Sequence, residues 1–188
     1  MPVELQLHIF TDASQLGFGA AAYLRLVFLD GEVEVAFLMA KTHVAPLKQR
    51  TIPQLELKGA CEGVDLATLI ATELHLDKTK TTYHTDSQTV LQWINSQTCK
   101  FDVFTSNRIG KIHRETDPTQ WRHVAGVYNP ADACSRGIDP AAVDSLVAFH
   151  QGPAFLRQDP ATWPTWESTS QETFQEATCS ALTELDDW

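Results

Sequence analysis

The sequence lacks the features that would assign it to a membrane, to the secretory pathway or to a zinc module. No apolar stretch reaches the ~18 residues that a membrane-spanning helix needs, because Arg25 interrupts the longest candidate, residues 19–29. The amino terminus does not show the basic and then apolar layout of a signal peptide. The four cysteines are widely spaced and form no C-x-x-C pair, which argues against a zinc knuckle or a disulfide scaffold. We therefore expect an intracellular protein, cytoplasmic or nuclear, without a membrane partner.

Basic residues are also scarce, and a net charge of -10 would ordinarily argue against a nucleic-acid partner. The acidic residues are, however, concentrated at one end of the chain. Residues 139–188 contain nine acids and one base, whereas residues 1–138 contain 15 acids and 13 bases. Because the larger part of the chain is nearly neutral, the total charge does not exclude binding to nucleic acid.

The patterns of hydrophobic and turn-forming residues predict both strands and helices. Strands are expected where apolar and β-branched residues alternate, at about 5–12, 17–29, 33–42, 80–85 and 120–124. Helices are expected at about 53–74, 87–96 and 101–114, and a further one is expected to begin with Asn129 as its N-cap. This order predicts an α/β protein with a five-stranded mixed sheet, which starts as an antiparallel meander, continues with parallel strands and carries helices on its faces.

A change of composition divides the chain near residue 156. Residues 1–156 contain all of the predicted strands and helices, and we expect them to form one domain. Residues 157–188 are acidic, rich in Ser and Thr, and without a clear period, which is typical of disordered segments. We therefore expect residues 157–188 to be a linker or tail.

Four acidic residues deserve comparison, although each has an ordinary structural explanation. Asp12 ends the first predicted strand and can form a turn with Ser14. Glu56 is expected in the first turn of its helix, where an acid offsets the helix dipole. Asp86 can cap the helix that follows it, and Asp132 is expected near the start of a helix, where an acid is again favoured.

Taken together, the same four residues predict a metal site. If the strands that end at Asp12 and Asp86 are parallel neighbours, both carboxylates lie at the same edge of the sheet, where α/β proteins build their sites. Glu56 and Asp132 begin helices that can reach this edge. Four carboxylates at one place repel one another by several kcal/mol unless cations bind between them. Oxygen ligands without a His or Cys cluster favour Mg²⁺ or Mn²⁺ over zinc.

Four motifs, in this order, resemble those of the ribonuclease H domain in LTR-retrotransposon polyproteins, most closely the BEL/Pao type: TDAS, TIPQLEL, HTDSQTVLQWI and WRHVAGVYNPADACSRG. The resemblance covers about residues 5–156. It implies a ribonuclease H-like fold and an endoribonuclease that hydrolyses the RNA strand of RNA–DNA hybrids. It also implies two Mg²⁺ ions as cofactors, for which Mn²⁺ can substitute.

The resemblance assigns the four carboxylates as both catalytic residues and metal ligands. Asp12 in TDAS would bridge the two ions, while Glu56 and Asp86 would complete the ion that faces the leaving 3′-oxygen. Asp132 in NPAD would hold the ion that activates the attacking water. Cellular relatives have a His in the loop before the last Asp, whereas this loop reads AGVYNPAD. That departure bears on the rate more than on the type of reaction.

Contacts to the hybrid are predicted from basic and polar residues near the motifs. The helix at 101–114 carries basic residues on one face, which is typical of a phosphate-binding stripe but also of an ordinary solvated surface. The candidate nucleic-acid-binding residues are Ser14, Ser87, Lys100, Asn107, Arg108, Lys111 and Arg114.

Two other readings remain open. A catalytically idle module that binds nucleic acid or protein would share the fold, and so would a DNA-cutting nuclease or transposase of the same superfold. The NPADACSRG segment and the number of acids favour ribonuclease H. A retrotransposon origin would make reverse transcriptase and integrase segments of a parent polyprotein possible partners, although the chain contains no polymerase, protease or integrase zinc signature.

Overall fold

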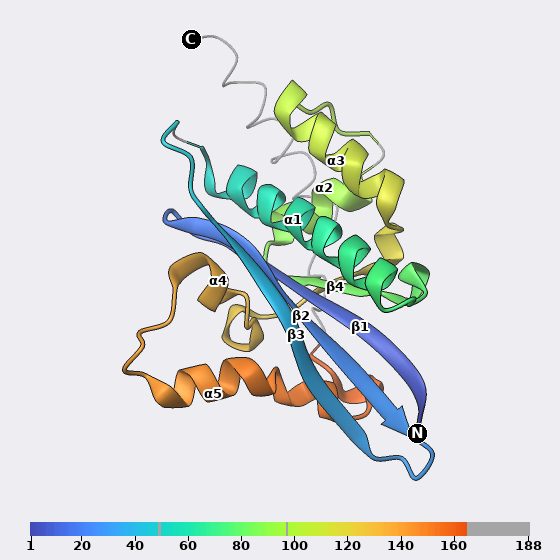
Figure 1. Ribbon diagram of the computed structural model, residues 1–188. Coiled ribbons are helices and arrows are strands. Elements are labelled where there is room, and N and C mark those ends of the chain that lie inside the picture. The colour runs from blue at the N-terminus through green and yellow to red at the C-terminus, as the bar shows by residue number, and fades with distance from the viewer. Residues whose placement is uncertain (49, 97, 165–188) are drawn as a thin grey trace.

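The computed structural model describes residues 1–48, 50–96 and 98–164, which form a mixed sheet with helices on both faces (Figure 1). The sheet has the order β3-β2-β1-β4-β5. Its strands are β1 (Pro2–Ala13), β2 (Gly17–Phe28), β3 (Val33–Val44), β4 (Thr82–Thr85) and β5 (Trp121–His123). β1 to β3 form an antiparallel meander, and β4 runs parallel to both β1 and β5. The predicted five-stranded mixed sheet is therefore confirmed.

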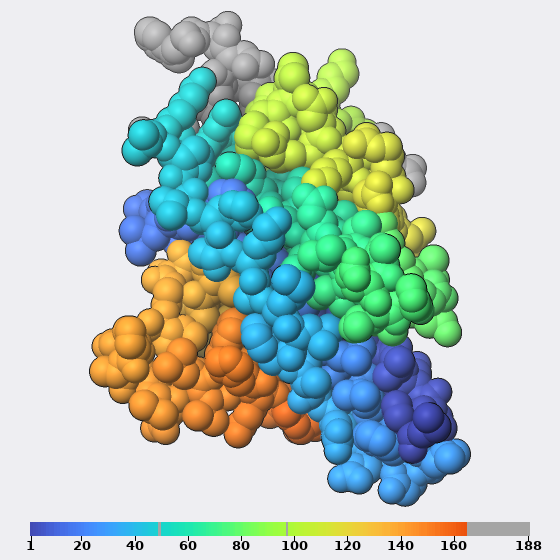
Figure 2. Space-filling view, viewed as in Figure 1, coloured from blue at the N-terminus to red at the C-terminus, as the bar shows by residue number. Residues whose placement is uncertain are grey.

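The helices form two layers that are separated by the sheet. One layer contains α1 (Ile52–Glu73), α2 (Gln88–Asn95) and α3 (Val103–Glu115). The other contains α4 (Asp132–Arg136) and α5 (Val143–Gln151), and Figure 2 shows the two layers on either side of the long strands. The described residues also contain short 3₁₀ turns: η1 (Lys78–Lys80), η2 (Pro118–Gln120), η3 (Gly126–Tyr128), η4 (Ala154–Arg157) and η5 (Pro160–Thr162). None of the described helices is both long enough and apolar enough to span a membrane.

The alternation of side chains along β1 supplies the core of both layers. Ile9 is fully buried on the side of α1, together with Leu57 and Val64. Its neighbour Phe10 is fully buried on the opposite side, where it packs with Tyr23. Successive residues of a strand point to opposite faces, so a single strand can hold two hydrophobic cores together.

α1 is fixed against β1 by its cap and by its glycines. Thr51 and Gln54 form a reciprocal capping box, which starts the helix one residue before the predicted Pro53. Gly63 faces Thr11 so closely that an added Cβ would lie 2.5 Å from the Thr11 Cγ2 atom. Residues without a large side chain therefore let the helix approach the strand that carries Asp12.

The segment after residue 156 begins as packed structure. Arg25, whose side chain is buried, donates from Nε to the Leu156 carbonyl at 2.7 Å and from Nη2 to the Gln158 carbonyl at 3.4 Å. Trp163 is also buried, with its ring 5.7 Å from the Arg25 guanidinium. The packed region thus extends past the predicted boundary to Trp163, and the rest of the predicted tail, 165–188, lies outside the described residues.

Two local predictions differ from the structure. Asn129 is not the N-cap of α4, because the cap position belongs to Ala131, whose backbone N–H donates to the Asn129 Oδ1 atom at 3.1 Å. α5 was not predicted at all. None of its residues is fully buried, and no side chain caps its start, although Asp144 in the first turn and Gly152 directly after the last are signals that could have identified it.

We predict that Arg25→Leu destabilises the protein by about 2–4 kcal/mol, because the substitution leaves the carbonyl of the buried Leu156 without its side-chain donor and removes the packing of Arg25 on Trp163. Urea unfolding measures this change in the free energy of unfolding. The matched control is Arg157→Leu, since Arg157 is exposed and donates to an exposed carbonyl, that of Gln151. We expect the control to change stability by no more than about 0.5 kcal/mol, and equal effects of the two substitutions would contradict the role given to Arg25.

Candidate metal site at the carboxyl edge of the sheet

The parallel pairing of β1 with β4 brings two of the predicted ligands to one edge. Thr11 of β1 is in register with Thr85 of β4. The next residue of each strand is an aspartate, Asp12 in one case and Asp86 in the other. Both carboxylates therefore emerge at the carboxyl end of the same pair of strands, as the sequence predicted.

Glu56 reaches this edge from α1 and is held there by a serine. The Ser87 hydroxyl donates to the Glu56 Oε2 atom at 2.5 Å. The same hydroxyl accepts from the backbone N–H of Val90 at 3.2 Å, so that Ser87 is the N-cap of α2. One serine thus fixes the orientation of Glu56 and starts the helix that follows Asp86.

Asp132 reaches the edge on α4, which is tied to β1 by two hydrogen bonds. Asn129 donates from its side chain to the Thr11 carbonyl at 3.0 Å. The Ser135 hydroxyl donates to the Asp12 Oδ2 atom. On the outer side of α4, Arg136 donates from Nε to the Asp132 Oδ1 atom at 2.6 Å.

Electrostatic coupling shows that the carboxylates lie close together. The pKa of Asp12 is raised to about 6, mainly by burial and then by repulsion from Asp86 and Asp132, against the opposing hydrogen bond from Ser135. Burial also raises the pKa of Asp86, with further repulsion from Glu56 and Asp132, while hydrogen bonding partly lowers it. Burial and then the charge of Asp12 raise the pKa of Glu56. The four acids therefore form one interacting group.

Other residues perform the structural tasks that the acids were expected to perform. The turn after β1 is closed by Ser14, whose hydroxyl accepts from the backbone N–H groups of Leu16 and Gly17 at 3.0 and 3.3 Å. α2 is capped by Ser87. The first turn of α1 contains no acid, because the helix starts at Ile52 and Glu56 is its fifth residue. Asp132 alone occupies a first helical turn as expected.

The donor chemistry of this group fits a hard divalent cation. All four candidate ligands are carboxylates, and the Asp86 Oδ1 atom is buried without a hydrogen-bond partner among the described residues. In the side-chain arrangement of the structure, however, the described residues contain no group of three or more His, Cys, Asp or Glu that could hold a metal ion. Ser135, Ser87 and Arg136 each engage one of the carboxylates, so ion binding would require these side chains to reorient.

A cavity on the side of α4 and α5 does not coincide with the point where the acids meet. It has a volume of about 1070 Å³ and lies between η3, α4, α5 and the η4–η5 segment. Asp132 is the one member of the acidic group that lines it. The candidate chemistry is therefore located at the edge of the sheet and not in this cavity.

The predicted nucleic-acid-binding residues are not brought together on one surface. Ser14 and Ser87 are buried and make the internal hydrogen bonds described above. Lys111 pairs with Asp65 of α1 at 2.6 Å, while Arg108 turns onto the ring of Phe104. Three further candidates remain exposed, namely Lys100, Asn107 and Arg114.

Two basic residues near the site were missed by the sequence reasoning. Arg50 precedes α1, and its guanidinium carbon lies 4.3 Å from the centre of the Phe104 ring. Lys58 is on α1, with its Nζ atom 4.4 Å from the centre of the Phe18 ring. Both flank the TIPQLEL motif directly, and this position next to Glu56 was the signal that could have identified them.

The order of the sheet and its two helical layers define a ribonuclease H-like fold. Residues 2–87 match the family model described as "Pao retrotransposon-like RNaseH-like domain", so the predicted family is confirmed over this segment. The matched segment includes Asp12, Glu56 and Asp86, whereas Asp132 lies beyond it. A search of curated proteins finds no match.

Solved structures similar to this chain include several ribonuclease H proteins. The N-terminal RNase H domain of a Mycobacterium tuberculosis protein is 16% identical with a TM-score of 0.45, and the match covers 76% of this chain and 99% of that one. RNase H1 from Halobacterium salinarum is 17% identical with a TM-score of 0.44, over 76% and 97% of the two chains. LC11-RNase H1, solved in complex with an RNA/DNA hybrid, is 10% identical with a TM-score of 0.46, over 77% and 100%. At these scores the likeness assigns no role to any residue.

We predict that Asp12→Asn stabilises the metal-free protein at neutral pH. The folded state raises the pKa of Asp12 from 3.8 to about 6, so the folded state binds the proton more tightly than the unfolded state does. The resulting stability is complete below the unfolded pKa and is lost as the pH rises through about 6. Because Asn resembles the protonated acid, the variant should be more stable by about 1–2 kcal/mol at pH 7.5, after allowance for partial solvent access.

Urea unfolding in EDTA at several pH values tests this prediction. The difference between variant and wild type should shrink as the pH falls from 7.5 to 4. Asp144→Asn, an exposed substitution of the same kind on α5, is the control and should change stability by no more than about 0.5 kcal/mol at either pH. If the stability difference between Asp12→Asn and the wild type does not depend on pH, the raised pKa of Asp12 is contradicted.

Proposed function

We propose that this protein is a metal-dependent endoribonuclease that hydrolyses the RNA strand of RNA–DNA hybrids and derives from a retrotransposon polyprotein. The observation that supports this proposal is the meeting of four carboxylates from four separate segments, with mutual repulsion, at the carboxyl edge of β1 and β4. Repelling acids are costly to the fold, and the structural tasks near them are performed by other residues. A function that needs the charges accounts for this cost.

In the proposed mechanism, Asp12, Glu56, Asp86 and Asp132 would hold two Mg²⁺ or Mn²⁺ ions. When bound, such ions supply Lewis-acid stabilisation of the phosphate and an activated water. The chain itself orients the ligands, because Ser87 holds Glu56 and Ser135 holds Asp12 by hydrogen bonds. Preference for the RNA strand would rest on contacts to 2′-hydroxyl groups and on helix shape, not on base sequence.

A catalytically idle module is the second candidate, and the side-chain arrangement favours it in one respect. Arg136 is paired with Asp132, and its pKa is raised by that hydrogen bond and by the charges of Asp132, Asp12 and Asp86. An arginine beside the acids offsets part of their repulsion without a metal. An idle protein of this kind would bind nucleic acid or another protein and cut neither.

We predict that the full chain cleaves the RNA strand of a labelled RNA–DNA hybrid in Mg²⁺ or Mn²⁺ but not in EDTA. Duplex DNA and duplex RNA should remain intact. Asp12→Asn and Asp86→Asn should each reduce the cleavage rate by more than roughly 100-fold. Loss of a residue that only supports a metal ligand costs roughly 10–100-fold, and each of these substitutions removes a proposed ligand itself. Cleavage products are resolved on denaturing gels.

Asp144→Asn is again the control and should cut like the wild type. Isothermal titration with Mn²⁺ gives a second readout, in which binding should weaken in Asp12→Asn. Binding of the hybrid without any turnover in either metal would reject the nuclease and support the idle module. Metal-dependent cutting of duplex DNA would instead favour another nuclease of the same superfold.

A further inference from the structure

Three basic residues gather around two aromatic rings next to the acidic edge. The guanidinium carbons of Arg108 and Arg50 lie 3.4 and 4.3 Å from the centre of the Phe104 ring. The Lys58 Nζ atom lies 4.4 Å from the centre of the Phe18 ring. We refer to these three cations as the Arg50–Lys58–Arg108 cluster. It joins the segment before α1, α1 itself and α3.

The positive charges of the cluster lie close to one another and are not neutralised by ion pairs. Burial lowers the pKa of Lys58, and the charges of Arg108 and Arg50 lower it further. The ion pairs found among the described residues involve none of the three cations. Like charges at such a separation repel, so the cluster is favourable for an external anion.

Asp102, an acid whose charge acts on Arg108, is occupied by other groups. Asp102 is the N-cap of α3, and its Oδ1 atom accepts from the backbone N–H of Thr105 at 2.6 Å. Its Oδ2 atom accepts from the Gln54 side chain at 3.4 Å. Asp102 thus contributes a favourable charge to Arg108 without forming an ion pair with it.

The aromatic contacts hold the guanidinium groups in a geometry suited to phosphate. Arg108 donates from Nη1 to the Phe104 carbonyl at 3.0 Å, which leaves its other N–H donors available. A guanidinium above an aromatic ring keeps its edge free for planar, paired hydrogen bonds to phosphate oxygens. Because the rings restrict the side chains beforehand, less conformational entropy is lost when an anion binds.

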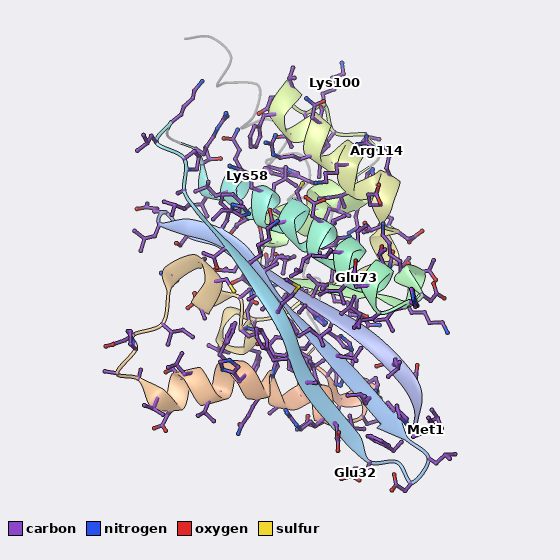
Figure 3. The ribbon with its side chains drawn as sticks, in the orientation of Figure 1. Met1, Glu32, Lys58, Glu73, Lys100 and Arg114 are labelled. Atoms are coloured by element: carbon purple, nitrogen blue, oxygen red, sulfur yellow. The ribbon has the colours of Figure 1, made fainter. Side chains whose placement is uncertain are left out.

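The cluster lies beside the acidic group. Lys58 is two residues after Glu56 on the same helix. Phe18, which lies below it, is paired with Ala13, the residue after Asp12. Figure 3 shows Lys58 on the first half of α1, whereas Arg114 belongs to the last turn of α3. The helix that carries Lys58 thus also carries Glu56, and the strand under Lys58 is paired with the strand that carries Asp12.

We propose that the Arg50–Lys58–Arg108 cluster binds the phosphate backbone of the nucleic acid and positions the strand to be cut over the acidic edge. The identity of that nucleic acid as an RNA–DNA hybrid rests on the proposed function. The contact is to phosphate, so it contributes affinity without base specificity. The predicted basic stripe is thereby replaced: Arg108 remains in the interface, while Lys111 and Arg114 are outside it.

Fluorescence anisotropy with a labelled RNA–DNA hybrid in EDTA tests this proposal on the full chain, because cleavage does not interfere. Each substitution has a control of the same residue type. Lys58→Gln is compared with Lys80→Gln, because Lys80 lies just before the amino end of β4, whereas the acids lie at its carboxyl end. Arg108→Gln is compared with Arg114→Gln. Arg50→Gln covers the third member, and circular dichroism verifies that every variant is folded.

We expect Arg50→Gln and Arg108→Gln each to weaken binding about tenfold, as for the loss of a charged hydrogen bond. Each should also reduce by about one the slope of log affinity against log salt concentration. The controls should bind within about twofold of the wild type, because a distant charge is screened at moderate salt. Equal losses in Arg108→Gln and Arg114→Gln would overturn the assignment.

Failure of this inference is distinguishable from failure of the proposed function. A wild type that binds the hybrid through the cluster but does not cut it in Mg²⁺ rejects the nuclease alone. A wild type that cuts, with cluster variants that bind and cut equally well, rejects the cluster alone. A synthetic peptide of residues 165–188 is the acidic competitor. If it binds the cluster while the hybrid does not bind, the cluster is a peptide site and the proposal is wrong.

Discussion

The parallel pairing of β1 with β4 is the constraint on which the candidate site depends. Thr11 lies opposite Thr85, so the aspartates that follow them leave the sheet together. A slip of one residue would turn the side chains of one strand to the opposite face. Register is fixed by the two hydrophobic cores, because Ile9 and Phe10 are both fully buried on opposite sides. The packing of the apolar residues thus determines where the acids meet.

Neighbouring polar residues perform the turn and capping tasks that Asp12 and Asp86 could have performed. Ser14 closes the turn after β1, and Ser87 caps α2. Thr51 and Gln54 cap α1. The carboxylates therefore remain close together at an energetic cost that the fold does not require. Functional sites often contain residues that destabilise the folded state beside others that stabilise it.

The long strands and helices could be predicted from the sequence because their periodicity and caps are local properties. β1 to β3 and α1 follow alternation, turn residues and a capping pattern within a few positions of the predicted bounds. The common edge of Asp12 and Asp86 could also be predicted, from their positions at the ends of neighbouring strands. These features need no knowledge of distant contacts.

The remaining features depend on contacts between distant parts of the chain. Asn129 resembles an N-cap, and its side chain accepts from the Ala131 N–H, but it also donates to the carbonyl of Thr11, more than a hundred residues earlier. The basic residues around Phe104, Arg50 before α1 and Arg108 on α3, are far apart in the sequence, and only the fold brings them together. Arg25 interrupts an apolar run in the sequence, yet it is buried because the carbonyls of a later segment need its donors. No local pattern contains this information.

The close contact of α1 with β1 links the position of two acids to a residue that has no side chain. A Cβ atom added to Gly59 would lie 2.9 Å from the backbone oxygen of Asp12. Gly59 is one helical turn beyond Glu56. The separation between the helix and the strand therefore sets the separation between these carboxylates, and an alanine at this position would alter the spacing of the acidic group while leaving its composition intact.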